Sequence, residues 1–127
     1  MRPVILLVLL ALAGVGLWHF LARPDPLPAA EVSALLQDRT AKGTWPNGQP
    51  YMIWFGPEGR SLHGAPERPT AEGRWRVAED GRACFALGGQ EEICNGVARE
   101  SGSYVWVLPG SGRTYPFAIR EGRDPAL

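Results

Sequence analysis

Ser61 and His63 are the residues whose types and spacing come closest to a catalytic pair. They stand two positions apart in a segment patterned like a short β-strand, so their side chains would share one face. A hydroxyl beside an imidazole is the arrangement of a nucleophile and its general base. The pattern supplies no acid to orient the imidazole, and the chain has neither a Gly-x-Ser-x-Gly motif nor a phosphate-binding loop. We therefore expect no catalytic residues and a protein that is not an enzyme.

Cys84 and Cys94 are the only two cysteines and give the most specific chemical signal in the chain. They flank a Gly-Gly dipeptide at positions 88–89, which predicts a tight turn between two strands. Strands joined there would place the two thiols opposite each other, and such a pair forms a disulfide in an exported protein. Closing a loop of about 11 residues would stabilise the fold by about 2.5–3 kcal/mol. The spacing is not Cys-x-x-Cys and His63 cannot complete a zinc site alone, so we expect no metal and no cofactor.

Tryptophan is frequent, and two segments rich in aromatic side chains, residues 50–55 and 104–108, are apolar on both faces. One face of each would enter a core, whereas the other needs a cover or is exposed to a partner. We expect a short helix to supply the cover. The alternative is an aromatic patch that binds a protein, glycan or lipid. The candidate binding surface comprises Met52, Trp54, Trp106, Arg113 and Tyr115.

The elements that would position these residues follow a membrane-like segment at residues 1–22. Residues 4–21 are uncharged, and as a helix they would span about 27 Å, close to the thickness of a hydrocarbon core. We expect a retained single-pass anchor; the alternative is a signal peptide, cleaved after the small-x-small motif at 11–13. The positive charges before the segment favour an N-terminus in the cytoplasm and the remaining chain outside the membrane. Cleavage would instead release a periplasmic or secreted protein.

A spacer and a short helix come next. Residues 23–28 carry alternating prolines, which favour an extended, stiff connection that holds a domain away from a bilayer. Residues 29–39 follow a proline suited to a helix start and have one apolar stripe, formed by Val32, Leu35 and Leu36. So short a helix is marginal alone, so its stripe must dock on the domain.

The rest of the chain alternates apolar and polar residues in short runs broken by Gly and Pro, which predicts antiparallel strands. Expected strands cover residues 40–45, 50–55, 60–63, 72–79, 82–87, 91–98, 104–108 and 114–120. Residues 64–71 are expected to form a loop, and Pro116 indicates an edge or bulge in the last strand. The final residues are expected to fray. Residues 29–127 would thus form a mainly β domain, a meander of seven or eight strands that closes into a small barrel or sandwich.

Composition narrows the function further. The chain has 127 residues, enough for one domain, and 13 basic residues balance 13 acidic ones. Nucleic-acid binders carry a basic excess, so no nucleic-acid partner is expected. Gly (16) and Pro (12) are abundant, yet 12 aromatic residues indicate a packed core rather than disorder.

Several short motifs resemble a group of small exported proteobacterial proteins of unknown function. These motifs are Gly43-Thr44-Trp45, the aromatic stretch from Tyr51 to Arg60 with its Glu58-Gly59 turn, and Gly73-Arg74-Trp75-Arg76-Val77. The cysteine pair follows them, and the likeness covers about residues 31–97. The resemblance implies a helix followed by a β-domain and implies no activity.

A second likeness is to the small periplasmic β-barrel inhibitors of c-type lysozyme. The loop Ser111-Gly112-Arg113-Thr114-Tyr115 is similar to the Ser-Gly-x-Arg-Tyr loop that those proteins insert into the lysozyme cleft. The Trp-Lys-Gly segment that follows in the inhibitors has no counterpart here, because the only lysine is Lys42.

The expected function is therefore that of a membrane-tethered periplasmic β-domain. It would bind a protein or another envelope component without catalysis. One alternative is a protein resembling the lysozyme inhibitors. The other is a small-ligand carrier or enzyme that works at the mouth of the barrel.

Overall fold

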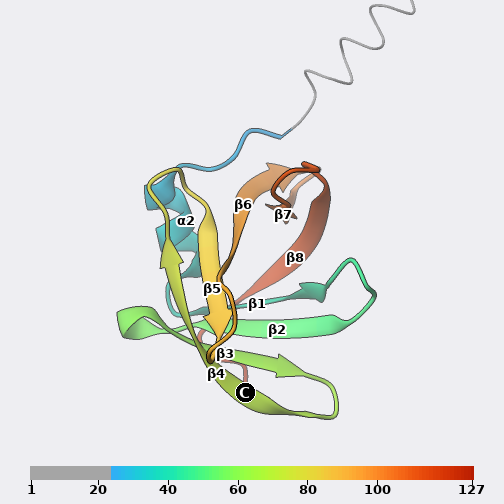
Figure 1. Cartoon of the computed structure of the whole chain (residues 1–127). Helices are drawn as coiled ribbons and strands as arrows, with labels where there is room; N and C mark the ends of the chain where they lie inside the picture. The colour runs from blue at the N-terminus through green and yellow to red at the C-terminus, as the bar shows by residue number, and fades with distance from the viewer. Residues whose placement is uncertain (1–23) are drawn as a thin grey trace, which may run out of the picture.

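The computed structural model describes residues 24–127, which form one closed antiparallel barrel of eight strands (Figure 1). Each strand pairs with the next along the chain, and β8 pairs with β1 to close the ring. The elements are α2 (Ala29–Leu36), β1 (Arg39–Thr44), β2 (Pro50–Phe55), η1 (Pro57–Gly59), β3 (Arg60–Ala65), β4 (Arg68–Val77), β5 (Ala83–Leu87), β6 (Ile93–Glu100), β7 (Ser103–Val107) and β8 (Thr114–Glu121). The predicted mainly β meander is thus confirmed, as a barrel rather than a sandwich.

The barrel interior is filled by large side chains from alternate positions of the strands, as a period of two requires. Phe55, Phe85 and Trp106 lie at its centre, where Trp106 is fully buried. Trp106 stacks on Phe117 with ring centroids 4.2 Å apart, and its indole N–H donates a hydrogen bond of 2.6 Å to the Tyr51 hydroxyl. Aromatic packing therefore holds the strands together from within.

Helix α2 closes one end of this barrel. Its apolar stripe of Val32, Leu35 and Leu36 is buried in the same cluster as the barrel interior. The residues before the helix also meet the barrel, because Pro26 bridges to Ala98 and the Leu27 N–H donates to the Val97 carbonyl. The helix was expected to cover an outer face of the strands. Instead it caps an end, because its stripe is apolar enough to join the interior.

The outer face of β1 and β2 is covered by the C-terminal segment, which does not fray. The Asp124 carboxylate is paired with Lys42 at 2.9 Å and Arg120 at 3.0 Å, and its backbone N–H donates to the Thr40 hydroxyl. These cations and hydrogen bonds, Lys42 foremost, hold the pKa of Asp124 below its usual range. The chain then ends beside β3 (Figure 1).

Two further expectations need correction. Residues 64–71 were expected as a loop, but β3 extends to Ala65 and β4 already begins at Arg68. The turn between them takes only two residues, with Glu67 at φ 61°. Pro116 was expected at an edge or a bulge, and a closed barrel has no edge strand. Pro116 is accommodated because the pairing of β8 with β1 begins only at Phe117.

The predicted membrane segment at residues 4–21 lies outside the described residues. Within residues 24–127, no helix is both long and apolar enough to cross a bilayer.

Candidate functional site

The end of the barrel opposite α2 is open and holds a cavity of about 410 Å³. Three turns surround it, those that join β1 to β2, β3 to β4, and β5 to β6. Its apolar wall includes Trp45, Tyr51, Ile53, Phe85 and Leu87. Most of its polar side chains, such as those of Asn47, Gln49, Gln90 and Glu91, belong to the turns at the rim. A concave, largely apolar hollow of this size is typical of a small-molecule site. We call it the mouth cavity.

The wall of the mouth cavity is built from stacked rings. Trp45 packs on Tyr51 with centroids 3.9 Å apart and planes 18° from parallel. Trp45 is held there by its turn, in which its N–H donates to the Gln49 carbonyl and its own carbonyl accepts from Gly48. Phe85 lies 6.1 Å from Trp45 across the cavity wall. The turn therefore positions an aromatic surface at the opening.

Ser61 and His63, the pair singled out in the sequence, share the inner face of β3. The Ser61 hydroxyl and Nε2 of His63 are 2.8 Å apart, and Ser61 is only 1 % exposed. His63 lines the mouth cavity, and burial lowers its pKa to about 4, so the ring is neutral at pH 7. No carboxylate of residues 24–127 hydrogen-bonds to His63. The pair offers a ligand one neutral hydrogen-bonding nitrogen, Nδ1.

Gly73 on β4 makes the room that this pair occupies. A Cβ at position 73 would lie 2.8 Å from Nε2 of His63 and 2.9 Å from Oγ of Ser61, and would also meet the Ala86 carbonyl. Real side chains do not approach so closely, so position 73 must lack one. The sequence analysis did not identify this role of Gly73, because the role depends on which strands lie next to each other in the closed barrel.

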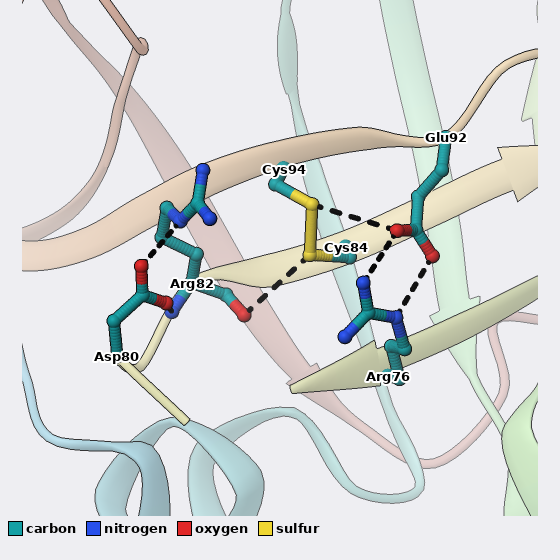
Figure 2. Close-up of a disulfide and its surroundings, with 6 residues drawn as sticks. All are labelled: Arg76, Asp80, Arg82, Cys84, Glu92 and Cys94. Atoms are coloured by element: carbon teal, nitrogen blue, oxygen red, sulfur yellow. Dashed lines mark hydrogen bonds and ion pairs between the residues drawn. A yellow bond between two sulfur atoms is a disulfide. The ribbon is translucent and has the colours of Figure 1, made fainter. Parts of the chain in front are cut away.

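The β5–β6 hairpin supplies another wall, and the Cys84–Cys94 disulfide crosses it (Figure 2). The predicted pairing is confirmed, with the two cysteines directly opposite in the register and their Cα atoms 4.0 Å apart. β5 and β6 share three cross-strand residue pairs, whereas β4 and β5 share five. Few other interactions therefore hold β5 and β6 together. The disulfide therefore holds in place the two strands from which Phe85 and Ile93 line the mouth cavity.

An ion pair supports the same hairpin from outside. The Arg76 guanidinium donates two hydrogen bonds to the Glu92 carboxylate, at 3.0 and 2.7 Å (Figure 2). Arg76 thereby holds the pKa of Glu92 below its usual range. Glu92 also lies near both cysteine sulfurs. Because the sulfurs are bonded to each other, these three groups do not form a thiolate metal site.

Ile93 stands at the rim of the mouth cavity with 55 % of its surface exposed. It is the one large hydrophobic side chain of residues 24–127 that is exposed. Two residues farther along the inner face of β6, Oδ1 of Asn95 is buried without a hydrogen-bond partner in the described part of the chain. The exposed apolar side chain of Ile93 therefore lies at the cavity, whereas Asn95 is not among the residues that line it.

The candidate binding surface proposed from the sequence does not form one patch. Trp106 is fully buried in the core, so placing it on a surface was wrong; its side of β7 faces the barrel interior. Tyr115 pairs with Trp106 in the register and is half-buried. Arg113 is exposed on the β7–β8 loop.

Met52 and Trp54 do lie on the outer face of β2, and both are partly covered. The Trp54 indole N–H donates to the Asp38 carboxylate at 3.2 Å, and the Arg123 guanidinium sits 5.9 Å from its ring. The C-terminal segment thus supplies the cover that the sequence analysis assigned to the helix.

Comparison with known proteins identifies a family and no function. No curated protein and no solved structure gives a significant match to this chain. A family model described as "Protein of unknown function (DUF995)" matches residues 4–103, most of the chain. The chain therefore belongs to the DUF995 family.

Proposed function

We propose that the barrel binds one small, mostly apolar molecule in the mouth cavity and does not transform it. The observation that carries this proposal is the cavity itself, about 410 Å³ in volume, walled by aromatic rings with His63 at its side. Ligand sites of about 300–1,000 Å³ with few polar groups are usual, and eight-stranded barrels are wide enough to hold one ligand. The exposed rim residue Ile93 supports the same interpretation.

A non-catalytic role is supported by the state of the Ser61–His63 pair. A nucleophile must reach its substrate, and the Ser61 hydroxyl is buried against the imidazole. A neutral histidine without an orienting carboxylate is also a poor general base, because nothing stabilises the imidazolium that would form. The pair instead suits the binding of a ligand by one hydrogen bond.

The test is a titration of the full-length chain in lipid nanodiscs with 1-aminoanthracene, a small neutral fluorophore, using empty nanodiscs as the blank. We expect saturable binding of one dye per chain. Ala71→Trp should abolish it, because Ala71 lines the mouth cavity and an indole there would fill the space. Arg113→Ala, on the exposed β7–β8 loop away from the cavity lining, is the matched control and should bind as wild type does. Emission equal to that of empty nanodiscs would contradict the proposal.

We also propose that residues 4–21 tether the barrel to a bacterial inner membrane, with residues 24–127 in the periplasm. The uncharged 18-residue run supports this, and so does the disulfide, because such bonds persist in oxidising compartments. Alkaline carbonate should leave the full-length chain in the membrane pellet, and protease added to spheroplasts should reach the barrel. Release by carbonate would indicate cleavage of the segment instead.

A second candidate function is inhibition of c-type lysozyme through the β7–β8 loop. Its support is the exposure of Arg113 in the motif that resembles the inhibitor loop. Micromolar full-length protein should then slow lysozyme, and Arg113→Ala should relieve the inhibition. Unchanged lysozyme activity would dismiss this candidate without affecting the cavity proposal.

A further inference from the structure

The barrel wall is split at its open end between β2 and β3. Their pairing stops at Met52 and Gly64, although β2 begins two residues earlier and β3 continues to Ala65. The register between β3 and β4 also shifts between His63 and Ala65. The β1–β2 and β3–β4 hairpins therefore project beyond the last pair as separate arms, on the same side of the molecule (Figure 1).

An outer groove of about 440 Å³ lies on the other side of this split. Its surface is mainly apolar, and the Leu127 side chain forms part of it by packing over Gly64, where a Cβ would lie 2.6 Å from Cδ2. The groove and the mouth cavity share the residues that border the split, which are Pro50, Tyr51, Met52, Gly64, Ala65 and Arg68. The two hollows thus meet across the wall of the barrel.

Arg68 is the cation at this junction. It is exposed and has no carboxylate partner within residues 24–127, whereas Arg60 and Arg76 pair with Glu72 and Glu92. Lys42 also lines the outer groove, but its ammonium is paired with Asp124. The carboxylate of Glu91 lies at the mouth cavity and not in the outer groove. An anionic group is therefore best placed at Arg68 on the outer side of the split.

We propose that the ligand is a single-chain amphiphile with a carboxylate, lying across the split with its chain in both hollows and its carboxylate at Arg68. This rests on the proposed function, because the mouth cavity must accept an apolar group first. A compact ring would fill the mouth cavity alone. A flexible chain is the apolar shape that continues through a narrow opening between two strands into a second apolar hollow.

The test compares straight-chain carboxylic acids of 8 to 16 carbons with alcohols of equal length. Binding to full-length protein in nanodiscs is followed by tryptophan fluorescence, with empty nanodiscs as the blank. We expect affinity to rise by up to about fourfold for each added methylene along the whole series. Arg68→Gln should weaken the acids about tenfold and leave the alcohols unchanged.

Two substitutions at neighbouring positions of β4 test the contribution of each hollow to binding separately. Thr70 lines only the outer groove and Ala71 only the mouth cavity. Thr70→Trp should leave the 8-carbon acid bound and stop the gain in affinity for longer chains. Ala71→Trp should remove binding at every length; if it lowers the melting temperature strongly, the smaller Ala71→Leu takes its place.

The outcomes keep the two proposals apart. If 1-aminoanthracene binds and Ala71→Trp removes it, but affinity is flat with chain length and Thr70→Trp has no effect, the amphiphile proposal is overturned and the cavity proposal stands. If neither the dye nor any acid binds, the proposed function itself has failed. Acids and alcohols that respond equally to Arg68→Gln would overturn the role of the carboxylate.

Discussion

His63 is a titratable side chain placed where its charged form is disfavoured. Burial at the mouth cavity lowers its pKa to about 4 from the usual value near 6.5. Between these two values the unfolded chain binds the proton more readily than the folded chain does. The contribution of neutral His63 to stability is therefore fully present above pH 6.5 and is lost as the pH falls toward 4.

The substitution His63→Gln should remove this part of the pH dependence. Glutamine can keep a hydrogen bond to Ser61 but does not titrate. We expect the free energy of unfolding of the wild type, relative to the variant, to fall by roughly 1–2 kcal/mol between pH 7 and pH 4.5, allowing for the partial exposure of the ring. Urea unfolding at several pH values measures it. Parallel curves for the two proteins would show that His63 does not titrate as described.

Gly73→Ala tests whether position 73 makes room for the pair. The new methyl group would meet Ser61, His63 and the Ala86 carbonyl, which is backbone and cannot move aside cheaply. We expect a loss of about 1–3 kcal/mol in the free energy of unfolding, as for overpacked interiors. Gly89→Ala is the control, because a Cβ there meets nothing within 4 Å. Equal melting temperatures for the two variants would contradict the account of Gly73.

The Ser61–His63 pair could be found from the sequence, but its role could not be inferred from the sequence alone. A period of two places both side chains on one face, and the 2.8 Å contact confirms that. The burial of the hydroxyl, and the need for glycine opposite it at position 73, depend on neighbours that are distant along the chain. The misplacement of Trp106 has the same origin, because β7 is apolar on both faces and alternation alone cannot say which face is inside.

Among the elements, the β5–β6 hairpin depends most on a covalent tie. Replacing both cysteines, as Cys84→Ser with Cys94→Ser, should lower the free energy of unfolding by about 2.5–3 kcal/mol, since the unfolded chain loses its closed loop. It should also weaken dye binding, because Phe85 and Ile93 line the mouth cavity from these strands. Wild type under a reducing agent should match the variant in both measurements. A variant as stable as the oxidised wild type would contradict this role of the bond.

Most elements were predictable because their turns have clear chemistry. Gly-Gly at 88–89 and Asn47-Gly48 fixed hairpins that the structure contains, and the expected bounds of β2 are those observed. The start of β4 was missed because Arg68-Pro69 interrupts the strand pattern. The positions of α2 and of the C-terminal segment were missed because an apolar stripe or a lone aspartate does not say which partner it meets.

For the molecule as a whole, closure of the sheet creates the two features on which the proposed function depends. Because α2 fills one end, the other end is left with the mouth cavity, and the pairing of β2 with β3 stops early beside it. A meander of eight short strands could be foreseen from the sequence. A ligand site at the mouth of the barrel was an alternative from the sequence, but the size and lining of the cavity could not be foreseen, because it is the space left between three turns after the ring has closed.

The most direct test of the account is a nuclear magnetic resonance titration of the tryptophan indole N–H signals with 1-aminoanthracene. Trp45 lines the mouth cavity, whereas the Trp54 indole faces outward and donates to Asp38. The account predicts a saturable shift of the Trp45 signal, assigned with Trp45→Phe, while the Trp54 signal stays in place. A Trp45 signal that does not move, or a shift at Trp54 of the same size, would contradict binding in the mouth of the barrel.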